Sequence, residues 1–142
     1  MRFIVLTLVA VLAGCDGPSP QIEVGDAWAR ATSAATSNAA VYMTIANRGG
    51  DDRLMSMTTP AAHSVTFHTM SVEGGVMRMR PISDGIDVAA KGRLMLAPNR
   101  THIMLSGLDR PLAEGQRIAA RLRFARSGSR DISISVVAAG AR

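Results

Sequence analysis

A chain of 142 residues with 16 basic and 11 acidic side chains has room for one domain and carries a formal net charge of +5 at pH 7. Its charges are scattered without a run of five like charges, and aromatic residues make up only 4% of the sequence. These features argue against a nucleic-acid-binding protein. They predict a solvated basic surface that favours anionic lipid or an acidic partner.

The first residues predict an export signal. Arg2 is followed by an apolar run over residues 3–13, which is too short for a stable membrane span but has the length of a signal-peptide core. The run leads into Leu-Ala-Gly-Cys, an arrangement that resembles a bacterial lipobox. We therefore expect removal of residues 1–14 and lipidation of Cys15, the only cysteine of the chain. The alternative is a plain secretory signal with a chance cysteine.

The residues after Cys15 divide into a tether and a domain. Residues 15–21 contain Gly17, Pro18, Ser19 and Pro20, a composition that suits a short tether between a membrane and a folded unit. The remaining residues 22–142 are numerous enough to bury one closed core without disulfides. The sequence thus predicts a single lipid-anchored domain outside the cytoplasm.

Residues 22–142 show short apolar segments separated by turn residues at intervals of roughly ten, which is typical of a β-sandwich or β-barrel. The predicted strands cover residues 22–30, 39–46, 53–57, 64–70, 76–81, 92–96, 101–105, 117–125 and 131–137. A turn at 73–75 predicts a hairpin between the fourth and fifth of them. Only residues 111–115 could hold a helical turn. We therefore expect an all-β fold.

Methionine is the unusual residue of this sequence, with eight left once the signal is removed. Thioethers are soft donors that prefer copper(I), and imidazole is a suitable second ligand type. His68-Thr69-Met70 and His102-Ile103-Met104 each place the two donors two residues apart, which is one face of a strand. Met77-Arg78-Met79 repeats the spacing on the predicted hairpin partner. These segments can converge on one copper(I) ion.

The other candidate residues are expected to be structural. His63 lies an odd number of residues before His68, so it faces the opposite side of a continuous strand and is predicted to be a surface residue. Met is usually a core gap-filler. The residues expected to pack in the core or at its rim are Met43, Met55, Met57, Met95 and Trp28. Asp51-Asp52 is predicted to be a solvated turn.

These residues also carry a resemblance to a known family. The chain resembles the periplasmic copper chaperones of the PCuAC family in His68-Thr69-Met70, in the segment 75–81, and in the segment 102–108. The likeness extends upstream to residues 28–30 and 39–43, and so covers nearly all of the mature chain. It implies a cupredoxin-like β-barrel or sandwich of the Greek-key type.

The family signature is a His, a Met some eleven residues later and a distant His-x-Met. The resemblance assigns these positions to His68, Met79, His102 and Met104. Met70 also matches a common methionine of the family and is a possible alternative ligand, with Met77 as a weaker one. The spacing between Met79 and His102 is a residue longer than the usual motif, which the loop between them could absorb.

The resemblance further implies a function and partners. It implies delivery of copper(I) to the copper site of cytochrome c oxidase subunit II, alongside Sco-type thiol proteins. The lipid anchor is a variation on relatives that are soluble in the periplasm. Asp16, directly after Cys15, resembles a signal for retention in the inner membrane, so the inner membrane is slightly favoured.

Competing functions can be ranked from the residues. No Ser-His-Asp arrangement, HExxH, CxxC or glycine-rich phosphate loop is present, so no enzyme is predicted. An electron-transfer copper site needs a thiolate, and Cys15 lies in the leader. Two alternatives remain: a structural or interaction β-domain lipoprotein with incidental Met and His residues, and a copper storage or scavenging protein.

Overall fold

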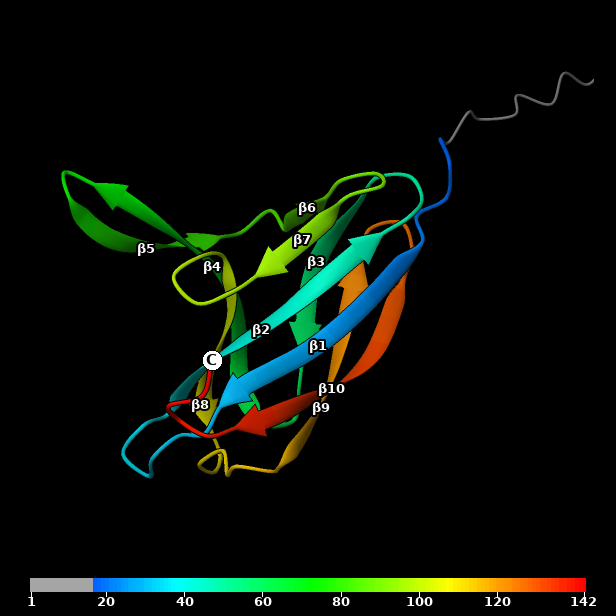
Figure 1. Cartoon of the computed structure of the whole chain (residues 1–142). Helices are drawn as coiled ribbons and strands as arrows, with labels where there is room; N and C mark the ends of the chain where they lie inside the picture. Colours follow the sequence, from blue (N-terminus) through cyan, green and yellow to red (C-terminus); the bar gives the residue numbers. More distant parts are fainter. Residues whose placement is uncertain (1–16) are drawn as a thin grey trace, which may run out of the picture.

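The computed structural model describes residues 17–142 of the chain and shows an all-β fold (Figure 1). The predicted signal peptide, Cys15 and Asp16 lie outside the described residues. No helix in residues 17–142 is long and apolar enough to cross a membrane. The prediction of an all-β domain is confirmed.

Ten strands form one sheet with the neighbour order β5-β4-β8-β2-β1-β10-β9-β3-β6, and β7 pairs with β2. Only the neighbours β5-β4, β2-β1 and β10-β9 are consecutive in the chain. All pairs are antiparallel except β1 and β10, which pair in parallel. The strands are β1 (Ile22–Arg30), β2 (Asn38–Asn47), β3 (Asp52–Thr58), β4 (Ala62–Glu73), β5 (Val76–Ile82), β6 (Ile86–Val88), β7 (Arg93–Leu96), β8 (His102–Leu108), β9 (Arg117–Phe124) and β10 (Ser129–Val137).

The core forms on the inner face of the curled sheet, where alternate residues of each strand are apolar. In β9 the buried positions are Ile118, Ala120, Leu122 and Phe124, with charged or small residues between them. This strict alternation fixes the face that each strand presents to the core, because a slip of one residue would expose the whole apolar set.

Nine strands lie where the sequence predicts them, and these segments differ from the sequence analysis at three points. The short strand β6 was missed, because its three residues between two turns show no alternation until Val88 pairs with Asp52 of β3. Residues 111–115 form no helix. Met95 is 51% exposed rather than buried, because Leu94 and Leu96 take the inward positions of β7 and Met95 faces out.

The hairpin β4–β5 projects from the rest of the sheet (Figure 1). We call its outer part, residues 70–82, the arm. Glu73 pairs with Val76 across Gly74 and Gly75, whose φ angles are +58° and +79°. Two positive φ angles in a two-residue loop are the geometry that twists in the same sense as a β-hairpin, and glycine adopts them without strain. The predicted turn is confirmed.

The opposite end of the molecule is where the described chain begins, and buried polar side chains hold it together. Asn47 accepts hydrogen bonds from the backbone N–H of Gln21 (3.1 Å) and Gly49 (3.0 Å), and its amide nitrogen donates to the carbonyls of Gly50 (2.6 Å) and Val88 (3.3 Å). The part of the predicted tether from Gly17 to Gln21 is thus bound to the domain, and we call this the tether end.

Asp52 contributes to the same end and corrects the expectation of a solvated turn. Asp51 is exposed, but Asp52 is only 5% exposed. Its carboxylate accepts hydrogen bonds from the backbone N–H of Arg53 (2.8 Å), Arg126 (2.8 Å) and Ser127 (3.0 Å). Burial raises the pKa of Asp52, but the hydrogen bonds from Ser127, Arg126 and Arg53 lower it by more, so the group stays ionised below its ordinary range.

Candidate metal centre

The two histidines of the predicted site form a cross-strand pair. His68 in β4 lies directly opposite His102 in β8, and their ring centroids are 6.0 Å apart with an interplanar angle of 27°. Directly opposed residues of antiparallel strands share a face of the sheet. Segments that are more than thirty residues apart in sequence therefore present their imidazoles side by side.

His102 is held with one ring nitrogen free. The side chain is 6% exposed, and its Nδ1 lies 2.8 Å from the carbonyl oxygen of Arg100. Because a carbonyl can only accept, this hydrogen bond requires the proton on Nδ1, which leaves the lone pair on Nε2. A carbonyl that fixes the tautomer in this way is the usual support of a metal-binding histidine.

His68 is half-buried and is kept neutral more readily than a free histidine. Burial lowers the pKa of His68 from its ordinary value of 6.5, and the charge of the neighbouring His102 lowers it further. Its Nδ1 lies 3.4 Å from the hydroxyl of Thr66, at the long limit of a hydrogen bond. The neutral imidazole is the form that binds a metal ion.

The methionines lie on the same face, at successive steps along the strands. Met70 of β4 is directly opposite Met79 of β5, one step from His68 toward the tip of the arm. Met77 lies opposite Val72, one step further out. Met104 lies opposite Thr66, one step from the histidine pair in the other direction. His68 thus has a methionine neighbour on both sides along the strands.

The strand register orders the predicted methionine ligands by their separation along the strands from the His68–His102 pair. Met79 and Met104, both assigned by the family pattern, flank the histidine pair from opposite directions, and Met79 is 50% exposed. Met70 is in contact distance of Met79 as a cross-strand pair. Met77 is the most remote of the four methionines from the histidines. The strand pairing therefore gathers all six predicted donors on one face and leaves Met70 as well placed as Met104.

A row of rings, which sequence reasoning did not anticipate, extends from the histidines across the sheet. Tyr42 of β2 lies 6.3 Å from His102, and Trp28 of β1 lies 4.6 Å from Tyr42, measured between ring centroids. Both aromatic side chains are buried, as expected for Trp28. The guanidinium of Arg142 covers the indole of Trp28 at 5.5 Å. The row could not be predicted from the sequence, because the pairing of Trp28 with Tyr42 depends on the register between β1 and β2.

The remaining sequence candidates lie away from this face. His63 is exposed, as predicted, and its Nε2 is 2.9 Å from a carboxylate oxygen of Asp109. Met43 and Met57 are buried in the core. Within residues 17–142, no three His, Cys, Asp or Glu side chains are grouped to hold an ion. The candidate metal centre is the face with two imidazoles and neighbouring thioethers.

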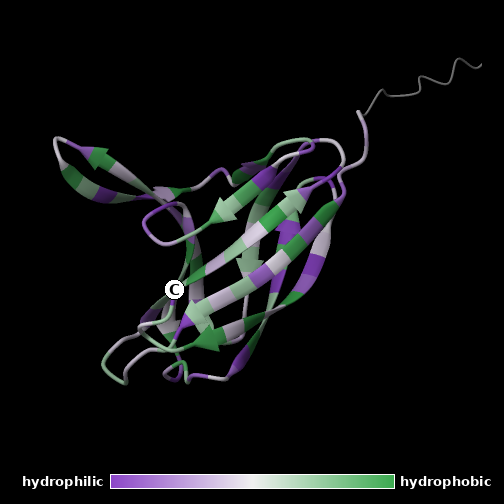
Figure 2. Cartoon of the chain, in the orientation of Figure 1, coloured by the Kyte–Doolittle hydropathy of each residue, from purple (hydrophilic) through white to green (hydrophobic). Residues whose placement is uncertain are grey.

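The two faces of the arm differ in chemistry. Met70, Val72, Met77 and Met79 share the face of the histidines. Val72, Met77 and Met79 are exposed, and Figure 2 colours parts of the projecting hairpin as hydrophobic. The other face carries Glu73, which is paired with Arg80 and lies 3.6 Å from Arg78. The arm therefore presents soft, apolar groups on the side of the candidate centre.

Comparisons with known proteins place the chain in a family of lipoproteins. Residues 22–136 match the family described as "Putative lipoprotein LpqE-like". The protein "Putative lipoprotein Lxx21020" of Leifsonia xyli subsp. xyli is 30% identical over 145 residues, which cover 92% of this chain and 86% of that protein.

Solved structures of similar fold include PCuAC domains. The copper-bound PCuAC domain from PmoF2 gives a TM-score of 0.70 at 24% identity, covering 82% of this chain and 92% of that domain. The solution structure of CuI-DR1885 from Deinococcus radiodurans gives a TM-score of 0.62 at 26% identity, covering 88% of this chain and 83% of that one. The likeness confirms the predicted cupredoxin-like fold and the resemblance to PCuAC domains.

Proposed function

We propose, from the premise that this chain belongs to the LpqE-like lipoprotein family and has the fold of a PCuAC domain, that it is a lipid-anchored copper(I) chaperone. The observation that supports this most strongly is the His68–His102 pair with the lone pair of His102 Nε2 left free. The names of the solved relatives state bound copper for one and copper(I) for another.

The proposed ligands are His68, Met79, His102 and Met104, with Met70 as an alternative and Met77 as a weaker one. All six lie on one face of β4, β5 and β8. Neutral imidazole and thioether ligands do not offset a divalent charge, and thioethers prefer the softer copper(I). The donor set on this face therefore fits copper(I) as a cargo.

The geometry also supports transfer rather than storage. Met79 is half exposed, and the strand that carries it, β5, pairs only with β4. A ligand of a partner protein can approach an ion held there before the arm's own sulfur leaves it. This exchange accounts for firm binding together with quick release, which a carrier needs and a storage protein does not.

We further propose that the protein acts without catalysis, on the periplasmic side of the inner membrane, and passes copper to cytochrome c oxidase subunit II with Sco-type proteins. The matched lipoproteins support anchoring outside the cytoplasm through Cys15. The recipient is tested by incubating the copper(I)-loaded protein with the copper-free soluble domain of subunit II, separating the two, and measuring copper in each. Retention of all copper by the donor would favour storage.

The copper site is tested by competition against a copper(I) chelator under anaerobic, reducing conditions. The variant H68A/H102A should lose at least about 1,000-fold in affinity, because loss of even a supporting group of a metal ligand costs about 10–100-fold. His63→Ala is the matched control, since this histidine is exposed and lies off the face. X-ray absorption on the loaded protein should show a mixed nitrogen and sulfur shell. Equal competition by H68A/H102A and the native protein would refute the assignment.

A further inference from the structure

The described chain begins between two hollows at the tether end. Arg126 fixes its course, since Nη2 donates to the carbonyl oxygens of Gly17 (3.1 Å) and Pro18 (3.2 Å). The backbone N–H of Gly50 donates to Ser19 (3.1 Å). The place where the chain leaves the domain is therefore set by hydrogen bonds.

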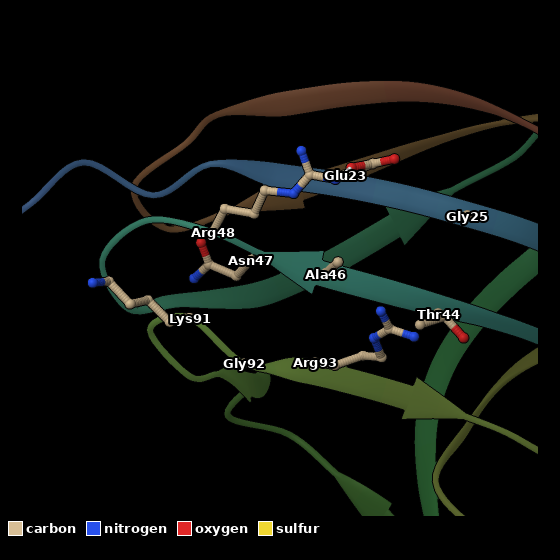
Figure 3. A pocket seen from close by; sticks show the side chains of 9 residues that line it. All are labelled: Glu23, Gly25, Thr44, Ala46, Asn47, Arg48, Lys91, Gly92 and Arg93. Carbon is tan, nitrogen blue, oxygen red and sulfur yellow. Dashed lines mark ion pairs between the residues drawn. The ribbon is translucent and has the colours of Figure 1, made fainter.

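The first hollow has a volume of about 440 Å³ and lies on the outer face of β1, β2 and β7, as Figure 3 shows. Arg48, Lys91 and Arg93 line it. Arg48 is paired with Glu23 at 2.8 Å, whereas Lys91 and Arg93 make no ion pair within residues 17–142. The backbone N–H of Lys91 donates to the carbonyl oxygen of Gly49 (3.1 Å), so this turn lies at the same end of the sheet as the tether. Figure 3 shows the side chain of Lys91 at the edge of the hollow.

The second hollow has a volume of about 510 Å³, and residues of the tether form part of its wall. Gly17, Ser19 and Pro20 line it together with Arg126 and Arg130. Arg126 is paired with Asp51 at 3.4 Å, and Arg130 makes only hydrogen bonds to backbone carbonyls. We call the basic residues of both hollows the tether rim: Arg48, Lys91, Arg93, Arg126 and Arg130.

The charges of this end do not cancel. The acidic side chains facing it are Glu23 and Asp51, each paired with a rim arginine, and the buried Asp52. Within the described residues, five basic groups against these three carboxylates leave an excess of two positive charges, which Asp16, next to Gly17 in the sequence, reduces to one. Three rim cations have no acidic partner within the described residues. The excess surrounds the exit of the tether on both sides.

The length of the chain before this exit brings the rim close to a membrane. Cys15 precedes Gly17 by two residues, and two extended residues span at most about 7 Å. A lipid on Cys15 therefore requires the rim to lie within reach of lipid headgroups. A tether this short cannot hold the tether end away from the bilayer surface.

We propose that the tether rim binds the phosphate groups of anionic phospholipid headgroups and so fixes the orientation of the domain on the membrane. This inference rests on the lipid anchor of the proposed function and not on copper binding. Tyr42, which abuts His102, lies five residues along β2 from Asn47 at the rim. At about 3.4 Å per residue, the copper face is held roughly 17 Å from the rim.

The test uses the full lipidated protein in nanodiscs of phosphatidylcholine, alone or mixed with an equal amount of phosphatidylglycerol. Hydrogen–deuterium exchange is followed in peptides covering residues 46–50 and 89–93. Exchange of these peptides should slow at least about fivefold in the anionic discs. This is the factor by which one basic residue near an anionic lipid surface strengthens binding. The slowing should vanish in K91E/R130E, which changes one unpaired cation in each hollow.

The matched control is R110E/R117E, which makes the same change of charge at the other end of the strands. In the anionic discs, hydrogen exchange of this variant should slow as much as that of the native protein. Equal exchange in both kinds of disc, or loss of the effect in the control, would overturn the proposal. The same slowing with inorganic phosphate and no lipid would assign the rim to free phosphate instead. Copper(I) competition in the same discs separates the outcomes, since K91E/R130E leaves the proposed ligands intact and its affinity should be unchanged.

Discussion

The tether end and the arm are built on opposite physical principles. At the tether end, the buried side chains of Asn47 and Asp52 satisfy the backbone of three loops. Residues 17–21 are bound there as well, by Arg126, the backbone of Gly50 and Asn47. Along the arm, large hydrophobic side chains stay exposed, including Val72 at 68% and Val76 at 55%. One region is fixed by internal hydrogen bonds, and the other keeps soft groups available to solvent.

The difference teaches how one small domain can combine stability with exchange of a ligand. Buried and fully paired polar groups are costly to disturb, so the tether end should resist unfolding. In the arm, β5 pairs only with β4 and most of its side chains are exposed, which is typical of segments that open easily. The proposed ligands span both regions: His102 and Met104 lie on the central strand β8, whereas Met79 lies on the arm.

The largest expected effect on stability comes from Asn47→Ala. The substitution leaves several buried or half-buried backbone groups without a partner, and each such group costs about 1–3 kcal/mol. We expect the free energy of unfolding, measured by urea denaturation, to fall by roughly 4 kcal/mol. Copper(I) affinity of the folded protein should not change.

The matched control for this prediction is Asn38→Ala, at the exposed start of the same strand. An exposed position away from special contacts is expected to change the free energy of unfolding by less than about 0.5 kcal/mol. If both variants lost similar stability, the contrast between the tether end and the rest of the sheet would fail.

The second prediction concerns a variant that should lose copper(I) affinity and keep its stability. His68→Ala removes a proposed ligand from a half-buried position, so copper(I) affinity should fall at least about 100-fold. The melting temperature of the copper-free protein should barely move, whereas its rise on adding copper(I) should shrink, because a ligand stabilises the state that it binds. A copper-free His68→Ala protein that unfolds as readily as Asn47→Ala would show that this face is structural.

A smaller effect is expected from Met79→Ala. Met70 stands directly opposite and can supply a sulfur in its place, so the affinity should fall only about tenfold, or about 1.4 kcal/mol. The double variant M70A/M79A should lose more than the sum of the two single losses in free energy. Met77→Ala, two residues along the same strand, is the comparison and should lose less affinity than Met79→Ala, because Met77 is the methionine most remote from the histidines. An equal loss in Met77→Ala would move the site toward the tip.

The smallest effect concerns pH. The pKa of His68 is lowered, first by burial and then by the charge of His102. In the copper-free protein, the midpoint of its NMR titration should therefore lie below 6.5, and copper(I) binding through this residue should persist into mildly acidic solution. His102→Gln removes the neighbouring charge and should move the midpoint of His68 upward.

The same shift has a consequence for stability with a definite sign. The unfolded chain takes up a proton on His68 near the ordinary pKa of 6.5, and the folded chain does so only at lower pH. Stability of the copper-free protein is thus lost as the pH falls from 6.5 through the folded pKa. A stability that rises on acidification across this range would contradict the lowered pKa.

Much of this architecture could be read from local patterns. Alternation in β9, the Gly74-Gly75 turn and the even spacing in His68-x-Met70 and His102-x-Met104 depend only on neighbours in the chain, because side chains of a strand alternate between its faces. The all-β fold and the common face of each His-x-Met pair followed from this. Met95 shows the limit, since an apolar strand of four residues does not reveal which of its faces meets the core.

The partners across the sheet were decided only by the tertiary structure. That His68 meets His102, that Met70 meets Met79, and that Tyr42 backs His102 depend on strand register, which is set by packing of the whole core and not by any local segment. Asp52 carries the same lesson. Its sequence neighbours suggest a solvated turn. In the structure the side chain of Asp52 is buried, and the backbone N–H groups of residues 126 and 127, far along the chain, donate hydrogen bonds that keep its carboxylate ionised.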